Sequence, residues 1–458
     1  MPTRQAKRAK NVEITLPHNW TPRGYQLPLC EYLGKGGKRA VAVWHRRAGK
    51  DSTALAWTSI AAIQQRVGLY WHMLPTLKQG RKVIWEGMWY DSQDRPHGML
   101  DFWPRELVDQ PRIDDMSILL KNGSRWQVVG SDNYDSLIGA NPVGVVFSEW
   151  AVADPRAWGF IRPILAENGG WAIFIYTPRG RTHGWDMLEQ AKHNESWFAQ
   201  VLTTDDTKAI SAEALQADKE AGMSEELFRQ EYLCSFDAAL QGAYYAHEMT
   251  RAQDEGRITK VPYDDFQRVE TWWDIGVRDR TAIWFAQTVG QRLHIIDYYE
   301  NSDEGLSFYV NLIDEWGRPP SRGGKGYRYS QHVFPFDIGQ REFTTGQTRL
   351  NFLHANGMRA IVAPDASFAD GIEIVRMTLG RCWFDEENCR QGINALRSYI
   401  KEQIPEERWG SPNVPIYRDK PVHSWASHGA DAFRYGSIAH RPRQSLATRR
   451  EFPQLGIV

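Results

Sequence analysis

The sequence predicts an α/β protein built from two domains. Its first half alternates short apolar strands with helical stretches, a pattern typical of a mainly parallel sheet with helices on both faces. The second half opens instead on three successive strands that form a meander. With 458 residues, of which 42% are hydrophobic and 24% charged, the chain can form two large or three average domains, and wholesale disorder is excluded.

Composition excludes several classes of protein. No uncharged apolar run approaches the roughly 18 residues of a membrane helix, and the first residues lack the apolar segment of a secretory signal. The four cysteines are scattered, without zinc-site spacing, which indicates a reducing, cytoplasmic protein. A net charge of −1 argues against coating nucleic acid by bulk charge, although residues 1–50 hold 11 Lys/Arg and 2 Asp/Glu.

In the first domain, apolar and β-branched runs predict strands, and amphipathic stretches predict helices. Asn122-Gly123 predicts a hairpin turn between two of the strands. The expected strands are 39–44, 68–74, 116–120, 125–129, 143–147 and 171–176, and the expected helices are 51–66, 77–90, 211–221 and 224–234.

In the second domain, the meander is followed by further strands that alternate with helices, which is the order of an RNase H-like fold. The expected strands are 269–275, 281–287, 293–299, 332–336 and 359–363. The expected helices are 305–316, 369–379, 386–401 and 427–439.

These elements divide the chain into five segments. We expect a basic flexible arm, a first domain that ends in a helical subdomain (205–245), a linker, a second domain and a basic tail. Their bounds are 1–20, 21–245, 246–266, 267–440 and 441–458.

A phosphate-binding loop is predicted at 45–52, between a strand and a helix. Such loops hold phosphate oxygens with backbone N–H groups, and a lysine reaches the outer phosphates. Gly49 and Lys50 stand where this requires, whereas Asp51 replaces the usual serine or threonine. The contact to a nucleotide-bound Mg²⁺ therefore falls to Asp51 or Ser52. The alternative is a Gly-Lys pair that only caps a helix.

Two further strand ends favour a nucleotide site. Strand 143–147 is followed by Ser148 and Glu149, and in ATPases an acid at this place orients the water that attacks the γ-phosphate. We expect this strand to lie beside the phosphate-loop strand. Ser148 stands where an aspartate normally helps to hold Mg²⁺. Thr177, at the end of strand 171–176, can sense the γ-phosphate and couple its loss to the domain.

Carboxylates of the second domain are candidates for a two-metal nuclease site, which needs several acids around cations roughly 3.5–4 Å apart. Asp274 lies in an apolar strand, where a charge is costly unless it is paired or metal-bound. Asp337 ends a later strand, and its competitor, Asp365, is expected to cap the next helix. Such an all-oxygen site suits Mg²⁺ or Mn²⁺. Three acids near the meander are expected to be solvated: Asp279, Asp297 and Glu300.

Together these segments resemble the large terminase subunit of tailed bacteriophages, an ATP-driven DNA-packaging motor. The resemblance covers residues 25–436 and implies a P-loop ATPase followed by an RNase H-like endonuclease. The resembling segments are GYQ (24–26), HRRAGKD (45–51), VVFSE (145–149), YTPRG (176–180) and FRQEYLCSF (228–236).

The resemblance also implies site residues. It places Tyr25 and Gln26 on the adenine side, brings Arg46 and Arg47 to the γ-phosphate, and makes Asp431 a metal ligand. His428 lies three residues before Asp431, on the same helix face, and is a further candidate ligand. The expected nucleotide contacts are Tyr25, Gln26, Arg46, Arg47, Ala48, Gly49, Lys50, Asp51 and Ser52, with Thr177 for coupling. The expected catalytic acids are Glu149, Asp274, Asp337 and Asp431.

The function expected from this resemblance is ATP-driven translocation of viral double-stranded DNA into a procapsid, with metal-dependent cleavage of concatemeric DNA. It implies ATP and Mg²⁺ or Mn²⁺ as cofactors and DNA, a portal protein and a small terminase subunit as partners, with no membrane. It also implies a monomer in solution and a ring, expected to be pentameric, at the portal vertex in the host cytoplasm, absent from the mature virion. The alternatives are a DNA-repair nuclease with an ATPase module and a non-enzymatic scaffold whose phosphate loop has decayed.

Overall fold

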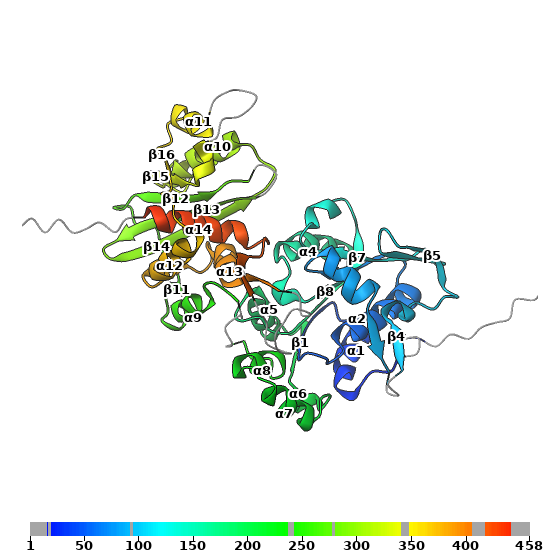
Figure 1. Cartoon of the computed structure of the whole chain (residues 1–458). Coiled ribbons are helices and arrows are strands. Elements are labelled where there is room, and N and C mark those ends of the chain that lie inside the picture. The colour runs from blue at the N-terminus through cyan, green and yellow to red at the C-terminus, as the bar shows by residue number, and fades with distance from the viewer. Residues whose placement is uncertain are drawn as a thin grey trace, which may run out of the picture. The chain divides into compact units, whose positions relative to one another are not determined.

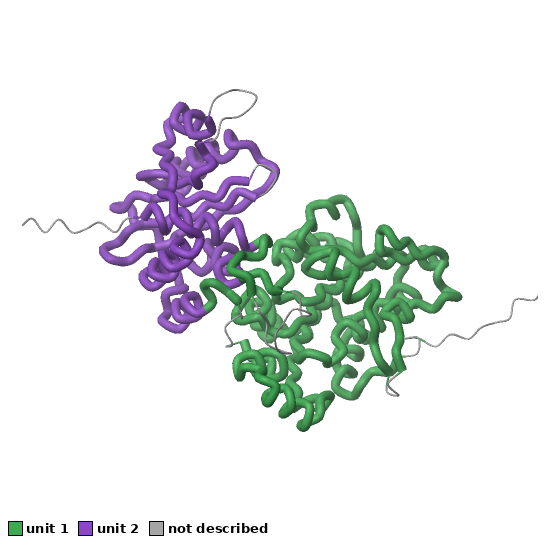
Figure 2. The backbone as a smooth tube through the Cα atoms, in the orientation of Figure 1, with its two compact units in different colours: residues 1–246, 400–425 green, residues 247–399, 426–458 purple. Residues whose placement is uncertain are grey.

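The computed structural model describes residues 16, 20–91, 95–236, 242–276, 280–339, 348–404 and 417–440, and these form two compact units. Unit 1 comprises residues 1–246 and 400–425, and unit 2 comprises residues 247–399 and 426–458 (Figure 2). The basic tail and nearly all of the basic arm lie outside the described residues. Among the described helices, none has the length and apolar character needed to span a membrane.

Unit 1 contains helices around an eight-stranded sheet (Figure 1). Its strands are β1 (Arg39–Trp44), β2 (Leu69–Leu74), β3 (Met88–Tyr90), β4 (Pro96–Gly98), β5 (Val108–Arg112), β6 (Ser117–Leu120), β7 (Arg125–Gly130), β8 (Pro142–Ser148), β9 (Trp171–Tyr176), β10 (Trp197–Leu202), β18 (Lys401–Gln403) and β19 (Tyr417–Pro421). Its helices are α1 (Leu27–Gly34), α2 (Lys50–Ile60), α3 (Leu77–Gly80), α4 (Arg156–Asn168), α5 (His183–Lys192), α6 (Thr204–Thr207), α7 (Ala212–Glu220) and α8 (Glu225–Glu231). Short turns of helix are η1 (Gly24–Gln26), η2 (Ala61–Gln65), η3 (Arg81–Trp85), η4 (Met99–Phe102), η5 (Tyr134–Leu137) and η6 (Trp150–Val152).

The sheet of unit 1 is mainly parallel, as predicted, and has the order β10-β1-β9-β8-β2-β7-β6-β5. The order corrects one expectation, because β9 lies between the phosphate-loop strand β1 and β8 and pairs in parallel with both. Helix α4 connects β8 to β9, and strands that are consecutive in the chain usually pair as neighbours. Strand β9 therefore lies beside β8 and separates β8 from β1.

The two faces of this sheet are covered by different helices. Ala40, Ala42 and Trp44 of β1 pack in one apolar cluster with residues of α1 and α2. Val41 and Val43 pack in a second cluster with residues of α4 and α5. Because successive strand residues point to opposite faces, an apolar run without polar interruption predicts a strand buried on both sides.

The helix predicted at 77–90 is wrong in its last part. The helical turns α3 and η3 end at Trp85, and Met88–Tyr90 is strand β3, antiparallel to β4. At Gly87 a Cβ would lie 1.9 Å from the carbonyl oxygen of Val83, so the chain turns out of the helix where only glycine fits. Strand β10 was not predicted, because it is an edge strand whose residues are mostly half-buried.

Unit 2 contains a seven-stranded sheet and its covering helices. Its strands are β11 (Ile258–Thr259), β12 (Val269–Asp274), β13 (Thr281–Val289), β14 (Arg292–Asn301), β15 (Tyr329–Phe334), β16 (Ala360–Val362) and β17 (Cys382–Asp385). Its helices are α9 (Ala246–Asp254), α10 (Leu306–Gly317), α11 (Arg349–Ala355), α12 (Phe368–Leu379), α13 (Arg390–Ser398) and α14 (Ser427–Ala439), with short turns η7 (Pro320–Arg322) and η8 (Phe336–Gly339).

The strand order of unit 2 is β11-β17-β14-β13-β12-β15-β16. The meander β12–β13–β14 is antiparallel, and β15 joins β12 in parallel, so the RNase H-like order predicted from the sequence is present. On one face, Trp273 packs with residues of α10 and α11. On the other, α14 packs so closely on β12 that a Cβ at Gly436 would lie 1.8 Å from the Trp272 ring.

Three segments of the second half differ from the expectations. Residues 246–266, expected as a linker, contain α9 and β11, and residues 400–425 return to unit 1 with hairpin β18–β19. The predicted helix 386–401 is shorter, because α13 spans only Arg390–Ser398 and follows a turn after strand β17. The Asp385 carboxylate then accepts hydrogen bonds from the backbone N–H groups of Glu387 and Asn388 (3.2 and 2.9 Å), which delays the start of α13.

Candidate active sites

The phosphate loop lies between β1 and α2, and Lys50 is held at its centre. Lys50 Nζ donates hydrogen bonds to the carbonyl oxygens of Trp44 (3.1 Å) and His45 (3.2 Å) and to Thr177 Oγ1 (2.9 Å). Thr177 follows β9, the neighbour of β1, and donates to the Trp44 carbonyl oxygen (3.1 Å). The predicted coupling residue Thr177 is therefore in direct contact with the predicted phosphate-binding lysine.

The backbone of this loop has a shape that suits an anion. Arg47 and Gly49 have left-handed φ angles of 68° and 78°, and such turns direct consecutive N–H groups toward one point. A Cβ at Gly49 would lie 2.8 Å from Gln26 Nε2. Gln26 Nε2 and the Tyr25 hydroxyl both donate to the Ala48 carbonyl oxygen (2.9 and 3.2 Å). The GYQ segment thus contacts the phosphate loop at the Ala48 carbonyl oxygen.

Asp51, in the first turn of α2, accepts two side-chain hydrogen bonds. Ser148 Oγ donates to Asp51 Oδ1 at 2.7 Å, and His72 Nε2 donates to the same oxygen at 3.1 Å. Burial alone would raise the pKa of Asp51, but these two hydrogen bonds and the charge of Lys50 lower it. The Ser52 hydroxyl donates to the Gly49 carbonyl oxygen (3.3 Å).

Glu149 directly follows β8 and is half-buried. Its φ of 52° is left-handed, which is strained for a residue with a side chain. Such strain concentrates at functional sites, where the surrounding structure holds a side chain in one direction. Its assignment as the acid that orients water remains a prediction.

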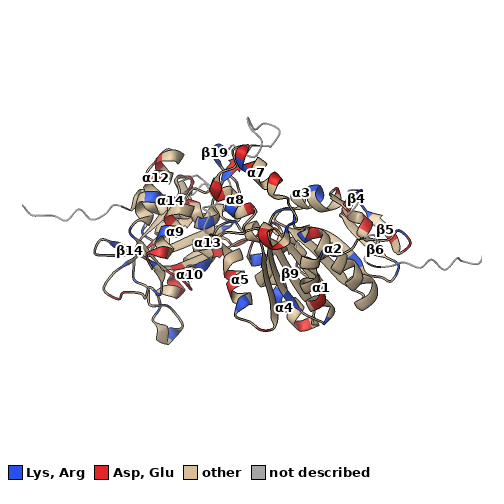
Figure 3. Ribbon diagram, turned by 90° about the horizontal axis from the view of Figure 1, so that it is seen from below, with Lys and Arg blue, Asp and Glu red and all other residues tan. Residues whose placement is uncertain are grey.

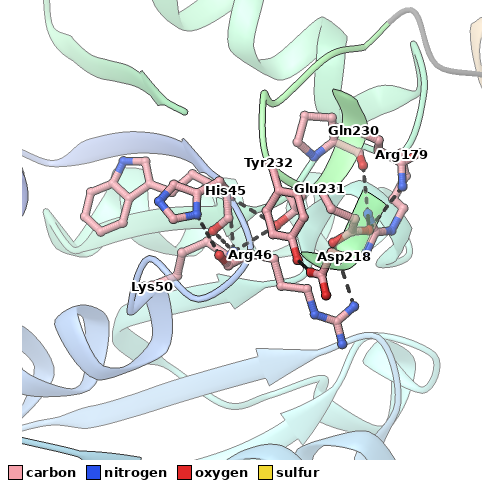
Figure 4. Close-up of polar contacts among 11 residues, drawn as sticks. His45, Arg46, Lys50, Arg179, Asp218, Gln230, Glu231 and Tyr232 are labelled. Atoms are coloured by element: carbon pink, nitrogen blue, oxygen red, sulfur yellow. Dashed lines mark hydrogen bonds and ion pairs between the residues drawn. The ribbon is translucent and has the colours of Figure 1, made fainter. Parts of the chain in front are cut away.

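Glu231, which was not predicted, joins three parts of unit 1 around the phosphate loop (Figure 4). Arg179 Nη1 donates to Glu231 Oε1 at 2.6 Å, and Arg46 Nη1 lies 3.8 Å from Oε2. The Arg46 N–H also donates to the Glu231 carbonyl oxygen (2.8 Å). Burial would raise the pKa of Glu231, but the charges of Arg179 and Arg46 lower it. Arg46, predicted to contact the γ-phosphate, is thus paired with Glu231 here.

In unit 2, Asp274 is the last residue of β12, and β15 runs parallel to it. The carboxyl ends of both strands meet at one edge of the sheet, so Asp337, in η8 just after β15, lies near Asp274. Burial raises the pKa of Asp274 to about 6, and the nearby charges of Asp431 and Asp337 act in the same direction. Asp431 and Asp337 are therefore close enough to Asp274 to oppose its ionisation.

Two residues of helix α14 complete this cluster. His428 Nδ1 donates to Asp274 Oδ2 at 3.0 Å. Asp431 Oδ1 accepts hydrogen bonds from Arg434 Nη2 (2.9 Å) and the Tyr399 hydroxyl (3.1 Å). Neither of these two partner residues was predicted from the sequence. Helix spacing could have indicated Arg434, three residues after Asp431.

The structure corrects the expected roles of several other acids. Asp365 is exposed and does not cap α12, because the Ser367 hydroxyl accepts the capping hydrogen bond from the Asp370 N–H (3.1 Å). Asp297 was expected to be solvated but is buried, and its carboxylate accepts hydrogen bonds from Lys325 Nζ and the Tyr327 hydroxyl. The carboxylate of Glu300 is also buried, beside the Tyr298 hydroxyl (2.5 Å). Asp279 lies outside the described residues.

The fit of these residues to a metal is set by their chemistry. Within the described ranges, no group of three or more His, Cys, Asp or Glu side chains is already gathered around one point, and Asp431 Oδ1 is occupied by Arg434 and Tyr399. The donors are nevertheless carboxylate oxygens, which suit Mg²⁺ or Mn²⁺. A divalent cation would relieve the repulsion between the negative charge of Asp274 and those of its acidic neighbours.

Comparison with known proteins agrees with these motifs. No family model matches the chain. The terminase large subunit of Escherichia phage T5 is 25% identical over 345 residues, 72% of this chain and 72% of that protein. The chain resembles a large terminase subunit. This confirms the resemblance that the motifs indicate.

Solved structures similar to the chain include two large terminases. The large terminase of a thermophilic bacteriophage, in complex with ADP, is 15% identical with a TM-score of 0.40, covering 90% of this chain and 98% of that one. The ATPase domain of the large terminase of a Thermus phage is 18% identical with a TM-score of 0.40, covering 48% of this chain and 99% of that one.

Proposed function

We propose that the chain is the large subunit of a viral DNA-packaging motor. In this proposal unit 1 hydrolyses ATP to move double-stranded DNA into a procapsid, and unit 2 cleaves concatemeric DNA. The observation that carries it is the presence in one chain of a phosphate loop with Lys50 bonded to Thr177 and a separate acid cluster around Asp274. The similarity to the T5 protein supports the same function and does not favour a repair nuclease or a scaffold.

At the ATPase site, Lys50 and the backbone N–H groups of the loop would bind the β- and γ-phosphates. Glu149 would orient the attacking water, because it stands at the end of β8 with its backbone fixed in a strained conformation. Thr177 accepts a hydrogen bond from Lys50, so a shift of Lys50 on loss of the γ-phosphate would be transmitted to the end of β9. Arg46 and Arg47 lie on the same loop and would meet the negative charge of the γ-phosphate.

At the nuclease site, Asp274, Asp337 and Asp431 would hold the metal ions, with His428 orienting Asp274 through its Nδ1–H. Bound divalent cations supply activation of water and stabilisation of the leaving 3′-oxygen. Arg434 pairs with Asp431 and would exchange this contact for DNA phosphate when metal binds. The two-metal assignment is supported by the proximity of the Asp431 and Asp337 carboxylates to Asp274.

Partners follow from the same proposal. They are DNA, a portal protein and a small terminase subunit. The chain would act as a ring, expected to be pentameric, at the portal vertex in the host cytoplasm, and it would be absent from the mature virion. Figure 3 shows basic and acidic residues interspersed along the described elements, in line with the net charge of −1. DNA contact would therefore depend on local Lys and Arg contacts to phosphate and weaken with salt.

Two substitutions test the division into two sites. Glu149→Gln should lower ATP turnover by about a hundredfold or more, the size expected for loss of a general base, and spare metal-dependent cleavage. Asp274→Ala should abolish cleavage and spare ATP turnover. Both activities are measured on the purified full chain. Loss of both activities in either folded variant would contradict the two-site proposal.

A further inference from the structure

The residues around Asp51 show an exchange of two side-chain types. In P-loop NTPases, the residue after the lysine is a serine or threonine, and an acid ends the strand that faces it; the two together hold Mg²⁺. Here the acid, Asp51, follows Lys50, and the hydroxyl, Ser148, ends β8. Both functional groups are present, each at the other's position.

The geometry shows that the exchanged groups still meet. Ser148 Oγ donates to Asp51 Oδ1 at 2.7 Å, although the residues lie 97 positions apart and on different elements. The contact joins the first turn of α2 to the carboxyl end of β8. A hydroxyl and a carboxylate are thus adjacent beside the phosphate loop, as in the usual arrangement.

A third residue fixes the direction of the carboxylate. His72, on β2, is completely buried, and its Nε2–H donates to Asp51 Oδ1 at 3.1 Å. Strand β2 pairs with β8, with His72 opposite Val146, so the imidazole approaches Asp51 from the strand beside that of Ser148. Within the described part of the chain, both hydrogen bonds to Asp51 fall on Oδ1, and Oδ2 keeps its capacity for a ligand.

We propose that Asp51 and Ser148 have exchanged roles, so that Asp51 supplies the carboxylate and Ser148 the hydroxyl to the divalent metal of a bound nucleotide, with His72 as the positioning residue that directs Asp51. This inference rests on the proposed ATPase function. Ser52, the other candidate, donates its hydroxyl to the Gly49 carbonyl oxygen of its own helix turn (3.3 Å), and the exchange assigns it no metal contact.

The experiment measures how far Mg²⁺ tightens ATP binding to the full chain, with EDTA as the metal-free reference. Asp51→Asn, which is nearly isosteric, and Asp51→Ser should each remove most of this tightening while metal-free binding persists. The double variant Asp51→Ser with Ser148→Asp, which restores the usual arrangement, should recover it. Ser52→Ala is the matched control and should keep wild-type tightening.

His72 is tested by rescue. His72→Phe removes the donor and should reduce the tightening by about tenfold, as for other groups that orient a metal ligand. His72→Gln, which keeps an N–H donor, should restore most of it. Equal tightening in the Phe and Gln variants would overturn the positioning role.

Two outcomes separate this inference from the proposed function. Full Mg²⁺ dependence in folded Asp51→Asn, or its loss in Ser52→Ala, would overturn the exchange alone. Absence of ATP binding by the wild-type chain, with and without Mg²⁺, would overturn the ATPase function and the exchange with it.

Discussion

Two carboxylates, one in each unit, show how neighbours decide the charge of a half-buried acid. Burial would raise the pKa of both Asp51 and Asp274. The side chains that lower the pKa of Asp51 are the donors Ser148, His72 and Lys50. Asp274 has one donor, His428, but faces two other acids, and its pKa is raised to about 6.

The difference matches what each site is proposed to bind. Asp51 is proposed to meet the metal ion of a bound nucleotide, and the donors around it keep its carboxylate ionised for that contact. An acid cluster gathers negative charge that only a cation can neutralise fully, so it is poised for metal. Fold alone does not create this difference, because both acids lie beside the ends of sheet strands.

The largest expected effect uses pH to separate the two acids. Protons compete with metal for Asp274, so Mn²⁺ affinity without nucleotide should fall by about tenfold per pH unit below about 6. Calorimetric titration of Mn²⁺ at pH 5, 6 and 7 measures it. ATP binding in EDTA is the internal control and should change less, because the pKa of Asp51 is lowered. Equal Mn²⁺ affinity at pH 5 and 7 would contradict the assignment.

The same pKa has a consequence for the metal-free protein. Because the pKa of Asp274 is raised from 3.8 to about 6 on folding, its contribution to stability is fully present below pH 3.8 and is lost as pH rises through about 6. Added Mn²⁺ should restore stability at pH 7.

A smaller effect is expected at Thr177. Thr177→Val removes the hydroxyl between Lys50 and the Trp44 carbonyl oxygen, and loss of one hydrogen bond of about 1 kcal/mol should lower ATP turnover by about fivefold. Thr177→Ser keeps the hydroxyl and should retain turnover. DNA cleavage should be unchanged in both. Loss of DNA cleavage in Thr177→Val would contradict the independence of the ATPase and nuclease sites.

Much of the fold could be predicted from local pattern. Strands β1 and β9 and helix α14 have the expected bounds to within a residue, because buried parallel strands and amphipathic helices leave strong periodic signals. Edge and short strands such as β10 and β17 carry mixed patterns and were missed. Strand order depends on contacts between distant segments, so the place of β9 between β1 and β8 could not be read locally.

The candidate sites divide in the same way. Asp274 stands out as an acid in an apolar strand, and His72 carries a comparable signal as a polar residue in the apolar run LYWHML. The partners Glu231 and Ser148 depend on pairings across 52 and 97 positions, from Arg179 and Asp51, which no local pattern reveals. The roles of the nucleotide and metal residues remain predictions.

The most direct measurement is cleavage of plasmid DNA by the purified chain with Mg²⁺ or Mn²⁺, comparing wild type with Asp431→Ala. Asp365→Ala, an exposed acid of the same unit, is the matched control. We predict metal-dependent cleavage by wild type and Asp365→Ala and none by Asp431→Ala. Cleavage that persists in Asp431→Ala, or no cleavage by wild type with either metal, would contradict the assignment of a nuclease to unit 2.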